Sequence, residues 1–342
     1  MGKDNVFISI VIPLYNKAHT IVNTLQTVFR QRYANFEIII VDDGSTDNSV
    51  ALIIEHFNDP RIRIIQQNNA GVSAARNKGV QEAKGTWIAF LDADDEWMPL
   101  YLQSLVNALN KYPDAEMIGC SSFHKDFKTG KFSCNSIIDK YYKQIVKIDY
   151  FINPDRMTHI GATMLKKDVF LQIGGFNTSL RINEDLLLLA LIALRRHYIY
   201  IGELLHVYVS NVPGQATSVK NKHDNDIKNL LYVINTIYHN YVTVGYENHL
   251  VPVAMKYRFL HIMMLFLKSY DYLSVTYFLD NVDSSLKSYI GIIDWMKNPR
   301  FNKIAIAYIY VSKLIWRTHG YPRVGDISKH TNEIINTLKD EQ

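Results

Sequence analysis

The chain has 342 residues, of which 48% are hydrophobic and 20% are charged, which predicts a globular protein of about two domains, or one large domain with an appendage. Its formal net charge of +4 is too small for a typical nucleic-acid-binding protein. The whole excess lies in residues 206–342, which hold 15 Lys and Arg against 11 Asp and Glu.

The sequence favours a cytoplasmic location. No run reaches the roughly 18 apolar residues of a membrane span. The N-terminal Met-Gly-Lys-Asp-Asn leads directly into an expected strand, so we expect no signal peptide. The two cysteines, Cys120 and Cys134, lack metal-type spacing and fit reduced thiols.

Strands and helices alternate through the first part of the chain. Apolar runs predict strands over 7–12, 36–41, 61–66 and 86–91, and apolar positions spaced three and four apart predict a helix after each strand. Pro13 should end the first strand, and Ser45 or Thr46 should cap the helix that runs to Phe57. This alternation predicts an α/β fold with a mostly parallel sheet covered by helices.

Acidic residues follow two of these strands. Asp42 and Asp43 come after the second strand, and Asp92, Asp94, Asp95 and Glu96 come after the fourth. Ligands of open α/β sheets bind at the carboxyl ends of the strands. In an extended chain Asp92 and Asp94 point to one side, and their oxygens suit Mg²⁺ or Mn²⁺. The alternatives are a solvated acidic turn and, for Asp42–Ser45, a helix-capping turn.

The expected helix over 71–83 connects the third and fourth strands. Its first residues are small, which lets a ligand approach the backbone, and it carries Arg76 and Lys78. Two acids for a metal beside two cations suggest a nucleoside diphosphate that the metal bridges.

The next part of the chain adds a second acidic pair. Strands are expected over 115–120 and 161–165, and a helix over 166–173 ends at Gly174-Gly175-Phe176. Residues 121–155 have no clear periodicity and read as a variable excursion toward an acceptor. Glu184 and Asp185 open a further helix, where the helix dipole alone would stabilise them. The alternative is that one of them is a general base.

The run from Gln66 to Pro99 strongly resembles the family 2 inverting glycosyltransferases, which have the GT-A fold and use nucleotide-sugar donors. The Gly-Gly-Phe and Glu-Asp segments resemble the same family. The resemblance implies a base contact for Asp42, a diphosphate contact for Arg76, a ribose and metal contact for Asp92, and Asp94 as the main ligand of Mn²⁺ or Mg²⁺. It implies that Asp185 is the catalytic base and that Glu184 supports the acceptor. The remaining donor-site residues that it implies are Pro13, Tyr15, Asn16, Asn69 and Ala93.

The resemblance weakens after the Glu-Asp pair. Tyr208 is present, but the Arg and the following His that accompany it in many relatives are missing, and Gln215–Ser218 is what remains of that loop. His206 could replace the missing ligand or be a structural residue. The chain has no Gln-x-x-Arg-Trp, the motif of processive relatives, which favours transfer of a single sugar.

Residues 221–342 lie outside the resemblance and read as helices, after a catalytic domain over 1–220 with a nucleotide half (1–115) and an acceptor half (116–220). Phe301–Arg317 mixes aromatic, aliphatic and basic residues. Such a helix could lie on a membrane surface, cover the catalytic domain or join two copies of the chain.

Together these features predict an enzyme that moves one sugar from a nucleotide donor, with UDP favoured, to a hydroxyl of a glycan or lipid-linked acceptor in surface polysaccharide synthesis. It would be cytoplasmic, with peripheral membrane association open. The alternatives are a degenerate GT-A binding or scaffold protein and a nucleotidyltransferase. The Pro-Leu-Tyr-Asn loop lacks the glycines that a nucleotidyltransferase would favour, and neither a P-loop nor a Rossmann glycine motif is present.

Overall fold

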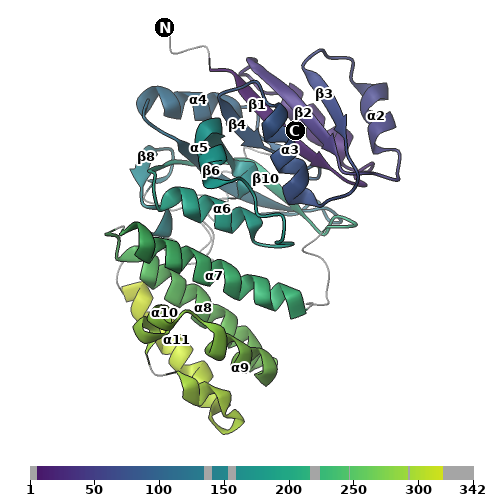
Figure 1. Cartoon of the computed structure of the whole chain (residues 1–342). Coiled ribbons are helices and arrows are strands. Elements are labelled where there is room, and N and C mark those ends of the chain that lie inside the picture. The colour runs from purple at the N-terminus through teal and green to yellow at the C-terminus, as the bar shows by residue number, and fades with distance from the viewer. Residues whose placement is uncertain are drawn as a thin grey trace. The chain divides into compact units, whose positions relative to one another are not determined.

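The computed structural model describes residues 6–134, 141–152, 159–215, 224–245, 247–291 and 293–318 (Figure 1). These residues form two compact units. The first holds the described residues from 6 to 148 and from 159 to 215, and the second holds those from 149 to 152 and from 224 to 318. The domain boundary predicted at residue 220 lies outside the described residues.

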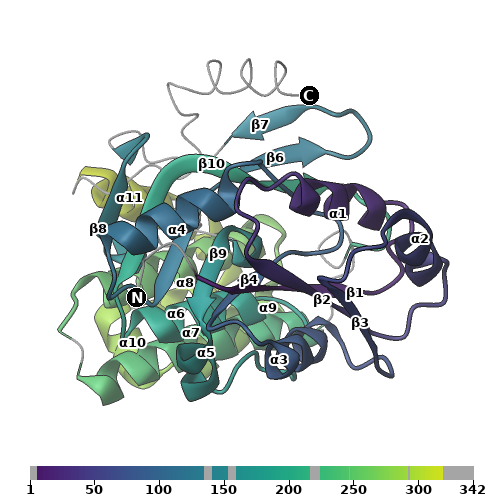
Figure 2. The same ribbon diagram turned by 90° about the horizontal axis from the view of Figure 1, so that it is seen from above.

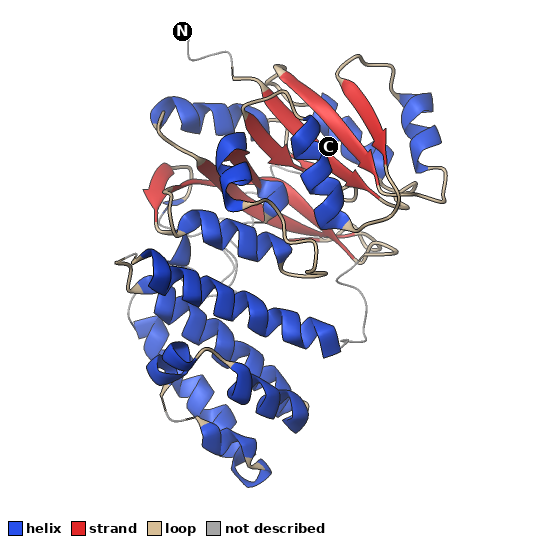
Figure 3. Ribbon diagram, viewed as in Figure 1, coloured by secondary structure: helices blue, strands red, loops and turns tan. Residues whose placement is uncertain are grey.

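The strands of the described chain belong to the first unit, whereas the second unit is helical (Figure 3). The first half of the first unit alternates strand and helix as the sequence predicts. Its elements are β1 (Ile8–Leu14), α1 (Ile21–Phe29), β2 (Phe36–Asp42), α2 (Ser49–His56), β3 (Ile62–Gln66), α3 (Val72–Glu82), β4 (Trp87–Phe90), β5 (Glu96–Trp97) and α4 (Tyr101–Lys111).

The second half of this unit adds longer strands. Its elements are β6 (Met117–Asp126), β7 (Phe132–Cys134), β8 (Ile145–Ile148), η3 (Ile160–Ala162), β9 (Thr163–Lys166), α5 (Lys167–Ile173), α6 (Glu184–Ala193) and β10 (Tyr198–Ser210).

The ten strands of the described residues join one sheet, whose order is β3-β2-β1-β4-β9-β6-β10-β5, with β7 beside β6 and β8 beside β10. The strands from β3 to β4 are parallel, β9 is antiparallel to both of its neighbours, and β10 is parallel to β6. The α/β fold that the sequence predicts is therefore confirmed, with a sheet that is mixed beyond β4. The carboxyl ends of β1, β2, β4, β6 and β10 face the same edge.

Helices cover both faces of the sheet, with α1 and α4 on one and α3 and α5 on the other (Figure 2). In β1, Ile8, Ile10 and Ile12 pack in the layer with α1 and α4. Val11 points the other way, and a Cβ on Gly79 of α3 would lie only 2.3 Å from its Cγ1. Glycine at position 79 thus brings α3, and the site residues it carries, close to the sheet.

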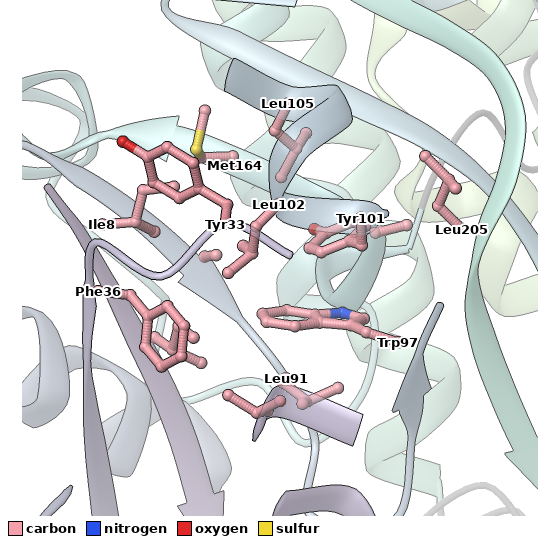
Figure 4. Close-up of a cluster of buried hydrophobic side chains, with 14 of the residues drawn as sticks. Ile8, Tyr33, Phe36, Leu91, Trp97, Tyr101, Leu102, Leu105, Met164 and Leu205 are labelled. Carbon is pink, nitrogen blue, oxygen red and sulfur yellow. The ribbon is translucent and has the colours of Figure 1, made fainter. Parts of the chain in front are cut away.

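The layer beneath α4 is anchored by an aromatic pair (Figure 4). The rings of Trp97 and Tyr101 stack with centroids 4.3 Å apart, and both side chains are buried. The Trp97 indole N–H donates to the carbonyl of Gly161 over 2.7 Å. This bond ties the segment that follows the acidic turn to the approach of β9.

Three local expectations were wrong. Pro13 does not end β1, because the strand continues to Leu14 along β2. The pairing of β1 with β4 stops at Val11, so at Pro13 no hydrogen bond to β4 requires a backbone N–H. Ser45 and Thr46 do not cap α2, since both contact Asn16 and the helix begins at Ser49. Residues 121–155 are not one irregular excursion, because β6 runs to Asp126 and β7 and β8 follow.

The second unit contains η2 (Tyr150–Ile152), α7 (Asp224–Val244), α8 (Leu250–Lys268), α9 (Tyr272–Asn281), α10 (Ser284–Ile290), η5 (Asp294–Lys297), η6 (Pro299–Phe301) and α11 (Asn302–Thr318). Among the described helices, α8 is long and apolar enough to cross a membrane by length and composition, although the sequence predicted no span. Of that window 61% is buried inside the structure, and a core helix passes the same test, so this is weak evidence for a span.

Candidate active site

The loops after β1 and β2 are joined by hydrogen bonds. Asn16 has a left-handed backbone, with φ of 51°, and its side-chain oxygen accepts from the Thr46 N–H over 2.8 Å. The Asn16 N–H donates to Ser45 Oγ over 3.1 Å. Pro13 is buried in β1, whereas the Tyr15 side chain is 47% exposed at this edge. Of the residues assigned to the donor base and ribose, Asn16 therefore shapes the loops and Tyr15 offers an open aromatic ring.

Asp42 and Asp43 are both buried but contact different groups. Asp42 accepts a hydrogen bond from the Ser45 N–H over 3.0 Å, which closes the turn after β2. Asp43 accepts from the Ala70 N–H over 2.8 Å and the Gly71 N–H over 2.9 Å. Asp43 thus holds the start of α3 against the end of β2, a role that the sequence analysis missed. Asn69 lies in the loop between β3 and α3 and is exposed.

The acidic turn after β4 is held from behind by α1. The carbonyl of Ala93, which is itself buried, accepts from Thr20 Oγ1 over 2.8 Å and from Thr24 Oγ1 over 3.1 Å. Thr24 Oγ1 also contacts the carbonyl of Asp95 over 2.9 Å. Ala93 therefore contributes its backbone to the turn, and the two threonines fix the direction of the neighbouring carboxylates.

Each acid of this turn has its own partner, although burial and the neighbouring carboxylates still raise the pKa of Asp95. Asp92 Oδ1 lies 2.6 Å from Arg76 Nη2, and Asp94 Oδ2 lies 2.6 Å from Lys17 Nζ. Asp95 contacts His206 and the Val209 N–H, and Glu96 contacts Lys125 at 2.8 Å. The sequence analysis missed Lys17, whose only signal was a basic residue directly after the Tyr15-Asn16 pair.

Arg76 joins the acidic turn after β4 to the acidic pair at the start of α6. Its guanidinium donates to Asp92 Oδ1 over 2.6 Å and, through Nη1, to Glu184 Oε1 over 2.9 Å. Its charged carbon lies 5.2 Å from the centre of the Phe176 ring, and the residue is 3% exposed. Burial alone would raise the pKa of Asp92, but the Arg76 charge lowers it below the usual value. A buried arginine that pairs with both carboxylates through its two Nη groups fixes the distance between the acidic turn and the start of α6.

The Gly-Gly-Phe turn lies beneath Arg76. The side chain of Asn77 donates to the Phe176 carbonyl and accepts from the Phe176 N–H, both over 2.9 Å. Gly175 has φ of 72°, and a Cβ there would lie 2.7 Å from the Asn77 side-chain oxygen. Glycine is therefore needed at position 175 for this turn to reach α3.

Glu184 and Asp185 have different surroundings although they are adjacent. Glu184 is buried, and burial together with the Asp185 charge raises its pKa to about 7, even though Arg76 opposes the shift. Asp185 is half-buried, and its Oδ1 accepts from the Leu186 N–H over 2.7 Å. The guanidinium thus holds Glu184 in place, while no ion pair to Asp185 is found among the described residues.

His206 belongs to a buried network behind the turn. Its Nε2 lies 3.1 Å from Asp95 Oδ2 and its Nδ1 lies 2.9 Å from Ser122 Oγ. Burial lowers the pKa of His206 to about 4, so the imidazole is neutral. The ring of Tyr208 stacks on that of His159, with the ring centroids 5.2 Å apart. His206 is thus a structural residue that orients Asp95.

The described residues contain no group of three or more His, Cys, Asp or Glu side chains arranged to hold a metal ion. An all-protein metal cage is therefore absent from the described part of the chain. Asp94 instead presents a carboxylate oxygen that is paired with the Lys17 ammonium. That arrangement fits a divalent cation held by one or two carboxylates and completed by substrate phosphates.

Comparison with known proteins identifies the class. Residues 9–174 match the model of glycosyl transferase family 2. The Escherichia coli enzyme named UDP-Glc:alpha-D-GlcNAc-diphosphoundecaprenol beta-1,3-glucosyltransferase WfgD is 38% identical over 117 residues, or 34% of this chain and 46% of that protein. The Escherichia coli protein YibD, an uncharacterized glycosyltransferase, is 42% identical over 100 residues, or 29% of each chain. The matches span 29%, 46% and 59% of the first three curated relatives.

A solved structure covers more of the chain. The crystal structure of Staphylococcus aureus TarS 1-349 in complex with UDP-GlcNAc matches with a TM-score of 0.64 and 14% identity, and the match covers 93% of both chains. At this identity the match shows the fold. Residues 9–174 are therefore a domain of glycosyltransferase family 2 on the GT-A fold, which confirms the resemblance seen in the sequence. The roles assigned to single residues stay predictions.

The shifted pKa of Glu184 makes a prediction about stability. Since its folded pKa is about 7 and its ordinary value is 4.5, the folded state keeps a proton that the unfolded chain has lost between these values. The free energy of unfolding should therefore fall as pH rises through this window, by up to about 1.4 kcal/mol per pH unit. In urea unfolding of Glu184→Gln between about pH 5 and about pH 7, the free energy of unfolding should depend less steeply on pH than in the wild type. Glu82→Gln, a change at a solvent-accessible carboxylate on α3, should keep the wild-type slope, and an equal slope in Glu184→Gln would refute the assignment.

Proposed function

We propose that the protein is an inverting glycosyltransferase that moves a single sugar from a nucleoside diphosphate donor, preferably a UDP-sugar, to a hydroxyl of a glycan or lipid-linked acceptor in surface polysaccharide synthesis. The observation that carries the proposal is that Arg76 forms ion pairs with both Asp92 and Glu184. It holds a donor-side acid and an acceptor-side acid in one site, as transfer between two substrates requires.

The donor would lie across the loops at the carboxyl ends of β1, β2 and β4. Tyr15 offers its ring to the base, and Asp42 offers a carboxylate that can accept from an imide N–H of the base. Asn69 and the backbone at Ala93 line the same edge. The name of WfgD includes a UDP-glucose donor, and TarS was crystallised with UDP-GlcNAc, which supports a UDP-sugar for this chain as well.

The leaving diphosphate needs its charge compensated. Asp94, with Asp92 nearby, would hold Mn²⁺ or Mg²⁺, which when bound would supply that compensation. Arg76 stays committed to its two carboxylates, so we assign it to orienting Asp92 and shaping the phosphate side of the site.

The acceptor hydroxyl must lose a proton as it attacks the anomeric carbon. Asp185 suits this role, because its carboxylate is half-buried and is not held by an ion pair among the described residues. Glu184 is held by Arg76 and so would position the acceptor side of the site. The carboxylate of Asp185 takes the proton, the acceptor oxygen bonds to the sugar, and the nucleoside diphosphate leaves from the opposite face.

Replacement of the metal ligand tests the donor site. Asp94→Ala should abolish the Mn²⁺-dependent part of UDP and UDP-sugar binding, because the metal loses its main protein oxygen. Calorimetric titration of UDP with and without Mn²⁺ measures this, and GDP titrated in parallel tests the base. Asp114→Ala, which removes an exposed carboxylate before β6, is the matched control. Unchanged Mn²⁺-dependent binding in Asp94→Ala would remove Asp94 from the metal site.

Replacement of the proposed catalytic base, Asp185, separates an effect on the chemical step from an effect on donor binding. Asp185→Asn should keep UDP-sugar affinity and lower turnover by ~100-fold or more, since general base catalysis contributes about this much. Release of nucleoside diphosphate in the presence of acceptor provides the assay. Full turnover in Asp185→Asn together with loss in Glu184→Gln would transfer the role to Glu184.

We also propose that the protein acts on the cytoplasmic face of a membrane, with α11 as its contact. Ile304, Val311 and Leu314 of α11 are 58%, 55% and 57% exposed, and Lys303 is exposed beside them. An apolar stripe with a basic flank suits an anionic lipid surface. In flotation with vesicles that contain anionic lipid, the double variant Ile304→Ser/Leu314→Ser should bind less than wild type. Unchanged flotation would reject the membrane role, and a lower molecular mass of the variant by sedimentation would indicate self-association instead.

A further inference from the structure

The cation position beside Asp94 is filled by a side chain of the protein itself. Lys17 Nζ lies 2.6 Å from Asp94 Oδ2, and the two side chains are 14% and 9% exposed. Lys17 belongs to the loop after β1, whereas Asp94 belongs to the turn after β4. This ammonium therefore lies where the proposed metal would bind.

The backbone of Lys17 is fixed although its side chain is long. Its N–H donates to Ser49 Oγ over 2.9 Å, and its carbonyl accepts from the N–H groups of Thr20 and Ile21 over 3.0 and 2.9 Å. These bonds hold the residue at the start of α1. The four-carbon side chain can change rotamer without disturbing them.

The other acids of this turn have partners besides Lys17. Asp92 is paired with Arg76, and Asp95 accepts from the Val209 N–H and contacts His206. Glu96 is paired with Lys125. If a divalent ion reached Asp94 while Lys17 stayed, two cations would meet at one carboxylate. If Lys17 left with nothing to receive it, a largely buried ammonium would lose its counter-charge.

We propose that the Lys17 ammonium occupies the metal position as an internal stand-in for the divalent cation. Lys17 leaves Asp94 only when the donor diphosphate can receive its ammonium, and the divalent cation and the nucleotide therefore bind cooperatively. The inference rests on the proposed donor site. The diphosphate solves both problems named above, since its oxygens supply further ligands to the metal and a new partner for Lys17. Lys17 is thus a positioning residue for the donor.

The coupling between the two ligands is measurable without turnover. Mn²⁺ is titrated into the full chain, with free Mn²⁺ followed by electron paramagnetic resonance, in the absence and the presence of saturating UDP. In the wild type, UDP should raise Mn²⁺ affinity by about tenfold or more, which lies within the range of known couplings. In Lys17→Met, which keeps an unbranched side chain of similar bulk and removes its charge, Mn²⁺ alone should bind about tenfold more tightly. The factor by which UDP raises Mn²⁺ affinity should become smaller than in the wild type, because only the direct ligation of the metal by the diphosphate remains.

Two further variants separate this mechanism from a general change in charge. Lys125→Met removes a cation paired with the same acidic segment, through Glu96, and should leave both Mn²⁺ affinities as in the wild type. Lys17→Arg keeps the charge and should keep weak binding of Mn²⁺ alone. Weaker coupling in Lys17→Met, combined with wild-type behaviour of Lys17→Arg, supports the stand-in role.

Other results overturn the proposal, and they differ from failure of the proposed function. Equal Mn²⁺ affinities in wild type and Lys17→Met, lower affinity in Lys17→Met, or an equal gain in Lys125→Met would each reject the stand-in role while the donor site survives. If the wild type binds neither UDP nor Mn²⁺ even when both are present, the donor site fails and the inference fails with it. A misfolded Lys17→Met would leave Lys17→Arg to decide, and tight binding of Mn²⁺ alone by that variant would reject the role.

Discussion

The site depends on one buried guanidinium. Arg76 lies on α3, yet it bonds to Asp92 at the end of β4 and to Glu184 at the start of α6, 108 residues further along the chain. Breaking a buried ion pair leaves an uncompensated charge, so neither carboxylate can move away at low cost. The close approach of α3 to β1 at Gly79 and the Asn77 contacts with Phe176 both place this helix. Packing of a single helix thus sets the separation between Asp92 and Glu184, on the proposed donor side and the proposed acceptor side.

The acids of the site fall into fixed and exchangeable groups. Asp43, Asp92, Asp95 and Glu184 are held by backbone amides, by Arg76 or by His206, and their partners come from the protein interior. Asp94 is paired with a flexible lysine, and Asp185 is bonded to the adjacent backbone. A catalytic site needs rigid groups to orient substrate and a few groups free to exchange partners with it. On this division, Asp94 and Asp185 are the two acids able to change partners during a reaction.

The sequence predicted the alternation of strands and helices well, because the strands from β1 to β4 are short and mostly apolar, and α1 and α4 each have an apolar face. It also predicted that acids gather at one edge, which follows from parallel strands. It failed where the outcome depends on distant partners. Nothing local to Asp43 shows that it bonds to the backbone just before α3, and nothing local to Lys17 shows that it faces Asp94. The continuation of β6 to Asp126 likewise depends on pairing with β10, more than seventy residues later in the sequence.

The part of the first unit beyond the family match still determines the geometry of the acidic turn. The match ends at residue 174, whereas β10 runs from Tyr198 to Ser210. Register shifts between Ile201 and Leu204 and between Leu204 and His206 bend this strand as it follows β6. The bend lets β10 pair with β5 next to the turn, and it brings His206 and the Val209 N–H to Asp95. Because Asp95 adjoins Asp94, the proposed metal ligand, a change in β10 can reach that carboxylate without altering any residue of the matched segment.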